Sequence, residues 1–272
     1  MSTHISTRVG ELFVTESGSG PPTVFWHSLF VGQRSWDLVL QALADDRRVV
    51  LIDGPNHGRS KPVDHDFTIE DCAVAAGEVL DQLDTSEPVD WVGNAFGGHV
   101  GLTLAASQPA RVRTLVTIGT PVQGLTFRER WFQTVPLVQI YRVVGANGFI
   151  MRALTDALLG SEAVTAQPDQ AEVVMEEFKS TPREAMLRAM RCLMLRRRDL
   201  GHLLPRITVP TLMLAAREDV IGWLPADAEL AVATMPDGTA GALAGGGHIA
   251  PLLLDPEGVA RRLEEFWASS RV

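Results

Sequence analysis

The sequence predicts an α/β protein built on a mostly parallel sheet. Short apolar runs, at 23–27, 48–53 and 89–94, are each followed by turn residues and then by a segment with helical periodicity. The same rhythm returns near the C-terminus, with apolar runs at 211–215 and 239–244. Because alternating strands and helices favour parallel strands with helices on both faces, we expect one sheet flanked by helices.

Composition limits the protein to one large domain, or one core with an insertion. The chain has 272 residues, of which 46% are hydrophobic, and its mean hydropathy is +0.09. This is enough apolar material for a buried core. The net charge of −9 and the lack of extended basic clusters argue against nucleic acid as a partner. We interpret the single basic run, Arg196 to Arg198, as a solvated helix end.

Sequence signals for export, membranes, metals and disulfides are weak. Met1 to His4 lack the basic and apolar regions of a secretion signal, and no uncharged apolar run reaches membrane-spanning length. We therefore expect a cytoplasmic protein without a membrane partner. Cys72 and Cys192 fit no metal-ligand spacing, so we expect reduced thiols, no metal and no cofactor.

The expected elements follow one another with short connections. Residues 4–16 predict a hairpin that turns near Gly10, and Thr68 and Asp71 resemble a capping box that opens a helix. The expected helices of the core are 34–44, 68–83, 95–107, 225–234 and one that begins after the N-cap Asp255, and a strand is expected at 112–119.

Residues 122–200 interrupt this alternation with helical patterns alone. We expect helices over 127–144, 149–159, 170–179 and 182–198, with no strand among them. The predicted organisation is therefore a core of residues 1–121 and 201–272, with a helical cap, or lid, of residues 122–200.

A sharp turn is predicted between the apolar run at 89–94 and the next helix. The sequence there is Gly-Asn-Ala-Phe-Gly-Gly over residues 93–98. With serine in place of Ala95 it would match G-x-S-x-G, in which the serine nucleophile is exposed on a tight strand-to-helix turn. The glycines that such a turn needs are present, and only the nucleophile is missing.

The order of this turn, then an acid, then a histidine resembles the α/β-hydrolase fold family, and the resemblance covers nearly the whole chain. It implies that His248, after three glycines, is the general base and that Asp219 orients it. Glu218 competes with Asp219 for the second role. A histidine suits the role of base because its pKa is matched to neutral pH.

The resemblance also implies an oxyanion hole made by two backbone N–H groups. One belongs to Phe96, the residue after the nucleophile position, and the other belongs to Leu29, in the loop after the strand at 23–27. That loop reads His-Ser-Leu where the family usually has His-Gly-x, so Ser28 departs from the family pattern. We expect Ser28 to lie beside the substrate.

The cap is expected to cover an apolar pocket that shields the reaction from water. Apolar residues at helical spacing in 127–154 can line such a pocket or simply pack in a core. The expected substrate-binding residues there are Trp131, Phe132, Tyr141, Phe149 and Met151, with Leu137, Ile150 and Leu154 as further candidates.

Ala95 excludes covalent catalysis through its own side chain and leaves several functions open. The favoured interpretation is a serine hydrolase of hydrophobic small-molecule esters or lactones, with a catalytic triad inactivated by the alanine so that substrate is trapped. The alternatives are a carbon–carbon bond hydrolase, a natural binding pseudo-enzyme, and chemistry that needs only the histidine as base. The expected partner is a hydrophobic small molecule, and a homodimer is possible.

Overall fold

The computed structural model describes residues 1–270 and confirms the α/β-hydrolase fold. Its eight-stranded sheet has the order β1-β2-β4-β3-β5-β6-β7-β8. Strands β1 and β2 form the expected hairpin, and β2 also pairs antiparallel with β4, whereas all other neighbouring strands are parallel. The strands are β1 Ser2–Thr7, β2 Gly10–Ser17, β3 Pro22–Trp26, β4 Arg48–Ile52, β5 Val89–Asn94, β6 Val112–Ile118, β7 Thr211–Ala216 and β8 Gly238–Leu243.

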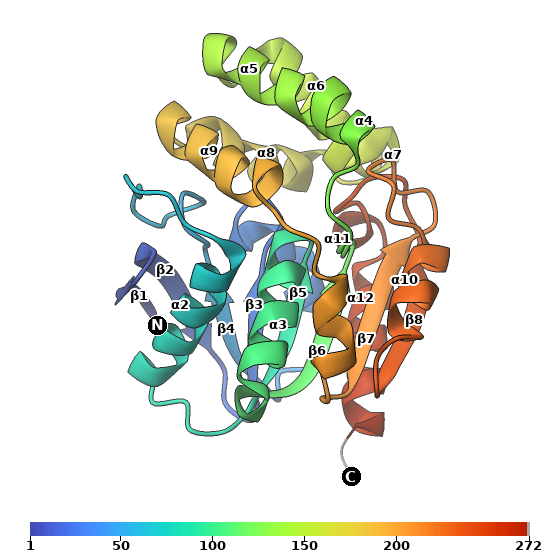
Figure 1. Ribbon diagram of the computed structural model, residues 1–272. Helices are drawn as coiled ribbons and strands as arrows, with labels where there is room; N and C mark the ends of the chain where they lie inside the picture. Colours follow the sequence, from blue (N-terminus) through green and yellow to red (C-terminus); the bar gives the residue numbers. More distant parts are fainter. Residues whose placement is uncertain (271–272) are drawn as a thin grey trace.

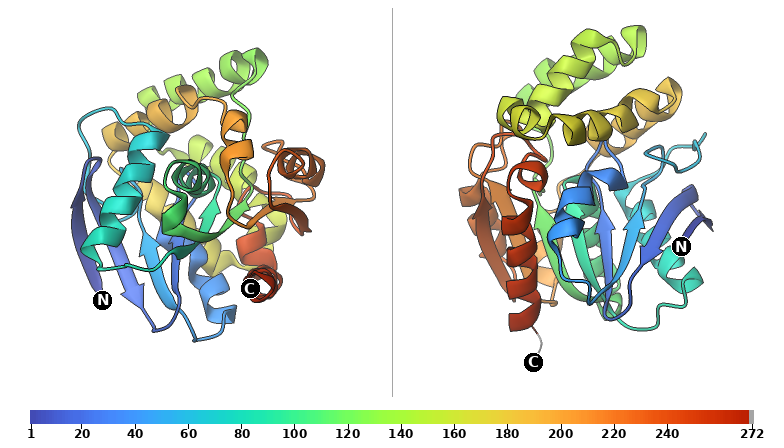
Figure 2. Two further views of the ribbon diagram at one scale, coloured as in Figure 1. Left: turned by 60° about the horizontal axis from the view of Figure 1, so that its bottom comes forward. Right: turned by 180° about the vertical axis from the view of Figure 1, so that it is seen from behind.

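Helices cover both faces of the sheet. Helices α1 and α12 lie on one face, and α2, α3 and α10 lie on the other (Figures 1 and 2). The α-helices of the core are α1 Asp37–Ala42, α2 Ile69–Gln82, α3 Phe96–Ser107, α10 Pro225–Val232, α11 Pro251–Leu254 and α12 Pro256–Ser269. Short 3-10 segments are η1 Gln33–Trp36, η2 Pro109–Arg111 and η5 Gly201–Arg206. Both predicted caps are present, since Thr68 and Asp255 accept backbone hydrogen bonds at the starts of α2 and α12.

An inserted helical segment separates β6 from β7. Figure 1 shows it above the sheet, with α5 and α6 forming an outer layer over α8 and α9. Its elements are α4 Phe127–Glu129, η3 Arg130–Thr134, α5 Val135–Val144, α6 Gly148–Leu158, α7 Gly160–Ala166, α8 Pro168–Ser180, α9 Arg183–Ala189 and η4 Met190–Leu195. The expected helices 127–144 and 182–198 contain the π-helical turns η3 and η4, and α7 was not expected.

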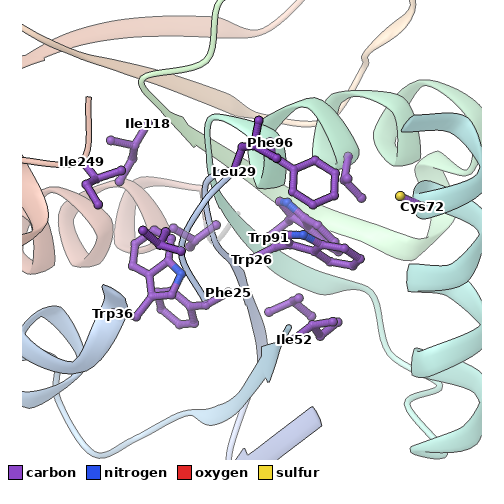
Figure 3. Packing of buried hydrophobic residues seen from close by; sticks show 14 of the residues in the cluster. Phe25, Trp26, Leu29, Trp36, Ile52, Cys72, Trp91, Phe96, Ile118 and Ile249 are labelled. Carbon is purple, nitrogen blue, oxygen red and sulfur yellow. The ribbon is translucent and has the colours of Figure 1, made fainter. Parts of the chain in front are cut away.

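Aromatic side chains fill the core directly beneath the turn at residues 93–98. The rings of Trp26 and Trp91 stack with centroids 5.8 Å apart, and Phe96 meets Trp26 edge-on at 5.7 Å (Figure 3). Each of these side chains is buried, which contributes about 1.5–3 kcal/mol per large apolar side chain. The strands β3 and β5 and the start of α3 are therefore locked together where the site is built.

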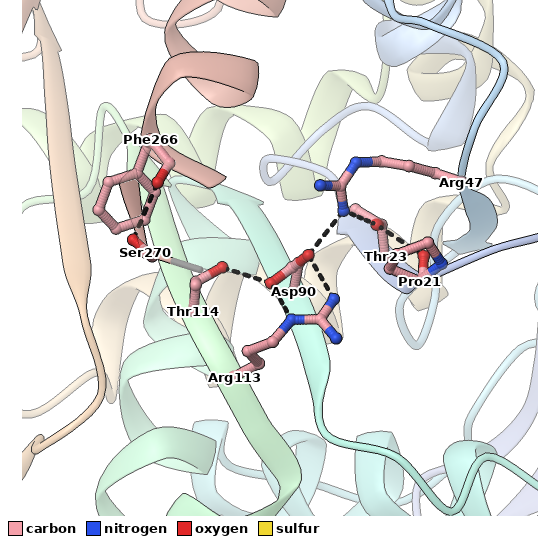
Figure 4. A network of polar contacts seen from close by, with 8 residues as sticks. All are labelled: Pro21, Thr23, Arg47, Asp90, Arg113, Thr114, Phe266 and Ser270. Carbon is pink, nitrogen blue, oxygen red and sulfur yellow. Dashed lines mark hydrogen bonds and ion pairs between the residues drawn. The ribbon is translucent and has the colours of Figure 1, made fainter. Parts of the chain in front are cut away.

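A buried ionic network fixes the other end of β5 (Figure 4). The Asp90 carboxylate accepts hydrogen bonds from Arg47, Arg113 and Thr114 over 2.6–2.9 Å. The Arg47 guanidinium also lies 3.5 Å from the centre of the Trp267 ring. Burial alone would raise the pKa of Asp90, but these hydrogen bonds outweigh it and lower the pKa. The network joins β5 to β6 and α12 far from the turn at residues 93–98.

Two other expectations from the sequence can be compared with the structure. Within residues 1–270, no helix has both the length and the apolar character needed to cross a bilayer. Cys72 and Cys192 are both buried and free, as expected.

Candidate active site

The turn between β5 and α3 holds Ala95 in an unusual backbone conformation. Its φ is 45° and its ψ is −98°, in the region that disfavours side chains with a Cβ. The Ala95 N–H donates to the Ile118 carbonyl over 2.9 Å, which ties the turn to β6. A Cβ on Gly93 would lie 2.2 Å from the Gly97 backbone, and a Cβ on Gly97 would lie 2.0 Å from the Trp26 carbonyl oxygen, so α3 can approach β5 and β3 only because both residues are glycine. The predicted sharp turn is therefore formed, and its apex carries a methyl group.

His248 and Asp219 form a buried hydrogen-bonded pair. His248 Nδ1 lies 2.7 Å from Asp219 Oδ2, and Asp219 Oδ1 accepts the Ile221 N–H over 2.8 Å. Since the ionised carboxylate can only accept, Nδ1 carries the proton and Nε2 is the basic nitrogen. The competing Glu218 is exposed and does not contact the ring. Position 219 therefore holds the acid beside the histidine.

The inserted helical segment also positions His248. The His248 N–H donates to the Ala157 carbonyl over 3.2 Å, and the Ile249 N–H donates to the Leu158 carbonyl over 2.8 Å. Gly247 is needed at this contact because a Cβ there would lie 2.4 Å from the Leu158 carbonyl oxygen. The end of α6 is thus packed against the histidine loop, so the insertion supports the site as well as covering it.

Two buried histidines shape the loop that contains Ser28 and Leu29. His27 Nε2 accepts the Gly54 N–H over 2.8 Å, and His57 Nε2 accepts the Phe30 N–H over 3.3 Å. Burial lowers the pKa of His27 to about 4 and that of His57 to about 3, so both rings are neutral and can accept these bonds. The loop is held in place although Ser28 occupies the position where glycine is usual.

The N–H groups of Leu29 and Phe96 are free to bind a ligand. Both residues line the cavity beside Ala95. Within residues 1–270, neither N–H donates a hydrogen bond to a protein acceptor. Unpaired backbone N–H groups are rare in folded proteins, and here the cavity gives them room for an external acceptor. Together with His248, they place two donors and one base around Ala95.

The cavity beside Ala95 has a volume of about 150 Å³ and a mainly apolar wall. The core contributes the predicted residues Ser28, Leu29, Ala95, Phe96 and His248. The remaining lining residues are Phe30, His99, Pro121, Leu125, Leu158, Leu193, Met194, Arg197 and Ile221. The inserted segment therefore contributes Leu125, Leu158 and the residues of η4 and its end.

The five cap residues expected to bind substrate do not line this cavity. Trp131, Phe132 and Phe149 are 52%, 72% and 68% exposed, because they lie on the outer helices. Tyr141 is buried against Phe178, with ring centroids 5.5 Å apart, and Met151 is half-buried against the core. This corrects the expected lining: helical spacing identifies an apolar face, but it does not say whether that face meets the sheet, another helix or solvent.

His99 and Arg197 also line the cavity, although the sequence did not predict them there, and both face the carbonyl of Pro121. His99 Nε2 lies 2.7 Å from that oxygen, and Arg197 Nη1 donates to it over 2.9 Å. Burial and the nearby Arg197 charge hold the pKa of His99 well below its ordinary value, so its ring is neutral. A signal for Arg197 was present: three consecutive helical residues point about 100° apart, so all three of Arg196 to Arg198 cannot face solvent equally.

The described residues contain no group of three or more histidine, cysteine or carboxylate side chains that could hold a metal ion. The side chains and amides of the site itself offer several chemical roles. His248 can accept a proton, Asp219 can stabilise the resulting charge, and the Leu29 and Phe96 amides can bind an oxyanion. This combination defines a hydrolase-type site on an α/β sheet.

Comparison with known proteins shows the family. Residues 23–262 match the model of the alpha/beta hydrolase family, and the chain belongs to this family. It is 30% identical over 270 residues to pimeloyl-[acyl-carrier protein] methyl ester esterase of Methylococcus capsulatus, covering 95% of this chain and 99% of that protein.

The chain is also similar to one further curated protein and to a solved structure. It is 27% identical over 224 residues to 2-hydroxy-6-oxononadienedioate/2-hydroxy-6-oxononatrienedioate hydrolase of Cupriavidus pinatubonensis, covering 77% of this chain and 71% of that protein. The solved enol-lactonase of Burkholderia xenovorans has a TM-score of 0.87 and 20% identity, covering 98% of this chain and 100% of that one. At that identity the structural match supports the fold alone.

Proposed function

We propose that this site is that of a carboxylic ester or lactone hydrolase in which Ala95 occupies the position of the nucleophilic serine. The observation that carries the proposal is the pairing of His248 with Asp219 at 2.7 Å beside a turn that keeps its strained geometry at Ala95. A protein that had lost its catalytic function would have no reason to keep both the His248–Asp219 pair and the strained turn. The chain with alanine would accordingly bind its substrate without forming an acyl-enzyme.

With serine at position 95, the parts would act in a fixed order. The serine oxygen attacks the substrate carbonyl carbon while its proton passes to His248 Nε2. The carbonyl oxygen becomes an oxyanion that accepts hydrogen bonds from the Leu29 and Phe96 amides, and Asp219 stabilises the imidazolium. His248 then returns the proton to the leaving oxygen, and water, activated in the same way, releases the acid.

The substrate class follows from the walls of the cavity. Leu158, Leu193 and Met194 face the reacting centre from the inserted segment, and they favour an apolar group beside the carbonyl. Closure of the site by these side chains also limits the access of bulk water. The substrate is therefore a small ester or lactone with an apolar portion, and the esterase relative supports the ester.

Restoring the nucleophile tests this proposal. Ala95→Ser should create ester or lactone hydrolysis that the alanine chain lacks, because loss of the serine costs on the order of 10⁶-fold in a well-studied serine protease. Activated esters of varied acyl length and a set of lactones serve as substrates. The matched control is Ala95→Ser combined with His248→Ala, which should remain inert. Equal inactivity of the single and double variants on all substrates would refute the proposal.

Carbon–carbon bond hydrolysis is a second candidate because one of the relatives has a name that indicates a dienedioate hydrolase. The same base and oxyanion donors could serve a ketone carbonyl, with a carbon fragment as the leaving group. The Ala95→Ser variant would then cleave a vinylogous diketone and leave simple esters intact. Assaying both substrate types with one preparation separates the two reactions.

Non-catalytic binding is a third candidate, and Ala95 itself is the observation that favours it. A binding protein would hold a carbonyl compound in the cavity through the Leu29 and Phe96 amides. His248→Gln would leave the affinity of such a binding protein for its ligand unchanged. In an enzyme, the same substitution made in the Ala95→Ser form would abolish turnover. Chemistry that uses His248 only as a base would instead appear in the alanine chain and vanish with that replacement.

A further inference from the structure

Arg197 separates two cavities of different character. Of the described residues, it alone lines both the cavity beside Ala95 and a larger outer one of about 680 Å³. The outer cavity is bordered by residues 66–70 of the core and by residues 195–198 at the end of the inserted segment. A group that extends from the reacting centre toward the outer cavity would therefore pass this guanidinium.

The Arg197 guanidinium has little protein to neutralise it. Its hydrogen bond among residues 1–270 goes to a neutral acceptor, the Pro121 carbonyl, and no carboxylate of those residues forms an ion pair with it. Burial lowers its pKa, and Asp199 and Glu129 act only at longer range in the opposite direction. Arg197 is half-buried, and a cation withdrawn in part from water is stabilised by an anionic partner, so this one is suited to an anion that the protein does not supply.

The neighbouring arginines do not share this position. Arg196 is exposed and pairs with Asp66, which also contacts Arg188, while Arg198 is exposed. The π-helical turn η4 ends at Leu195, so the three arginines lie beyond the helix, in a turn and irregular chain. Arg197 lines both cavities while its neighbours are exposed, which corrects the expectation that the whole run is a solvated helix end.

The outer cavity is itself positive. Its wall carries four arginines against two carboxylates, and one of those carboxylates, Asp66, is already paired with Arg196. The whole chain has a net charge of −9, so this positive cavity is a local exception. An anionic molecule would be attracted to this cavity while being repelled by most of the remaining surface.

We propose that Arg197 binds a carboxylate carried by the substrate, so that the enzyme's substrates are esters or lactones with an acidic group remote from the reacting carbonyl. This rests on the proposed function and names its substrate class. The planar guanidinium can bind a carboxylate through two parallel hydrogen bonds, which also fixes the orientation of the ligand. The carbonyl would then be aimed at the Leu29 and Phe96 amides from a fixed point across the cavity.

The test compares charged and neutral substrates of the same length. In the Ala95→Ser form, we expect the monomethyl esters of short dicarboxylic acids to be hydrolysed with higher kcat/KM than the dimethyl esters. Arg197→Met should lower kcat/KM for the half-ester by on the order of 10- to 100-fold and leave the diester nearly unchanged. Arg197→Lys should recover part of the loss. Arg152→Met removes an exposed charge from the same insertion and lines neither cavity, so it should have no effect.

A merely structural role for Arg197 would give a different result. Loss of its hydrogen bond to the Pro121 carbonyl would lower activity on both esters equally, and this outcome would overturn the proposal. A preference of the Ala95→Ser form for the diester over the half-ester would overturn it too. Circular dichroism checks the fold of each variant. If Arg197→Met does not fold, Arg197→Gln makes the same comparison, because its amide can still donate to the Pro121 carbonyl.

Binding to the unaltered chain keeps this inference separate from the proposed function. Calorimetry with the alanine chain should detect the half-ester but not the diester, and Arg197→Met should abolish that binding. Arg197-dependent binding together with an inert Ala95→Ser form would support the carboxylate site and refute the hydrolase. Hydrolysis of the diester without any dependence on Arg197 would support the hydrolase and refute the carboxylate site.

Discussion

Ala95 keeps a backbone conformation that costs energy for any residue with a Cβ. A φ of 45° with a ψ of −98° is worth on the order of 1–3 kcal/mol of strain. The strain is maintained by the packing of β5, β6 and α3, since the Ala95 N–H bonds to Ile118 and the following turn bonds to His27. The turn's shape therefore comes from its surroundings and not from its apical residue, so a serine would adopt it too.

Ala95→Gly should for this reason stabilise the protein. Glycine adopts the positive φ without strain, and the relief should exceed its extra entropy in the unfolded chain, giving a gain of about 1 kcal/mol. Urea denaturation measures the free energy of unfolding. The matched control is Ala153→Gly, at an exposed position in the middle of α6, which should lose about 1 kcal/mol. A loss of stability in both variants would contradict this account of the turn.

Asp219 acts on the reaction only through His248. In the Ala95→Ser form, Asp219→Asn should lower kcat by about 10⁴-fold, because the amide can favour the wrong histidine tautomer and cannot stabilise the imidazolium. Glu218→Gln should change kcat little, since Glu218 is exposed and away from the ring. Initial rates on one ester give both values. If the two variants ranked in the opposite order, Glu218 would be the acid.

At the scale of elements, the inserted segment is docked on the core through a half-buried carboxyl group. Glu177 of α8 accepts the Gly32 N–H over 2.7 Å, close to the Asp53 carboxylate. Burial and the proximity of Asp53 raise the pKa of Glu177 to about 8. The docked form therefore favours the protonated Glu177. The contribution of Glu177 to folding stability is fully present below the unfolded pKa of about 4.5 and is lost as the pH rises through about 8.

Glu177→Gln should remove this dependence while keeping the hydrogen bond. The amide oxygen can accept the Gly32 N–H, and no charge has to be buried at high pH. We expect the variant to exceed the parent in free energy of unfolding by a few kcal/mol at pH 8 and to differ little at pH 4.5. Exposed Glu176→Gln on the same helix is the control. A difference that stays constant between these pH values would show that Glu177 does not titrate as described.

Element positions were predictable where the signal is local. The turn at residues 93–98, the acid and the histidine follow one another in a fixed chain order, and each lies just after a strand. The wall of the cavity was not predictable, because it depends on how two layers of helices stack. Trp131 and Phe149 are large apolar residues in helical segments of the insertion, as Leu158 is, yet they are exposed whereas Leu158 lines the cavity. The inward position of Arg197 was not predicted, because the run of three arginines was interpreted as a solvated helix end.

At the scale of the whole molecule, buried titrating groups set the pH range of stability. Burial lowers the pKa values of His27, His57 and His99 and raises those of Asp53 and Glu177. The contributions of these neutral histidines to folding stability are present above the unfolded pKa of about 6.5. They are lost as the pH falls toward the lower pKa values of the folded protein. The raised carboxyl groups act in the opposite direction. Three histidines against two carboxyl groups predict a net loss of stability on acidification.

The free energy of unfolding should therefore fall between pH 7 and pH 5. Each of His27 and His57 contributes a loss of roughly 2 kcal/mol at pH 5, which the raised carboxyl groups offset only in part. Urea denaturation at the two pH values measures the change in the free energy of unfolding. The slope of that free energy against pH gives the number of protons taken up on unfolding. His202→Gln, at an exposed position, should leave the slope unchanged. A stability equal or higher at pH 5 would contradict the assignment of neutral buried rings.

A substrate carbonyl should bind between the two free amides, with His248 at its other side. A crystal structure of the Ala95 chain soaked with a methyl half-ester tests this arrangement. We expect an intact ester, with its carbonyl oxygen about 2.7–3.1 Å from the Leu29 and Phe96 nitrogens and its leaving oxygen toward His248 Nε2. A ligand in the same cavity with its carbonyl turned away from both amides would contradict this arrangement.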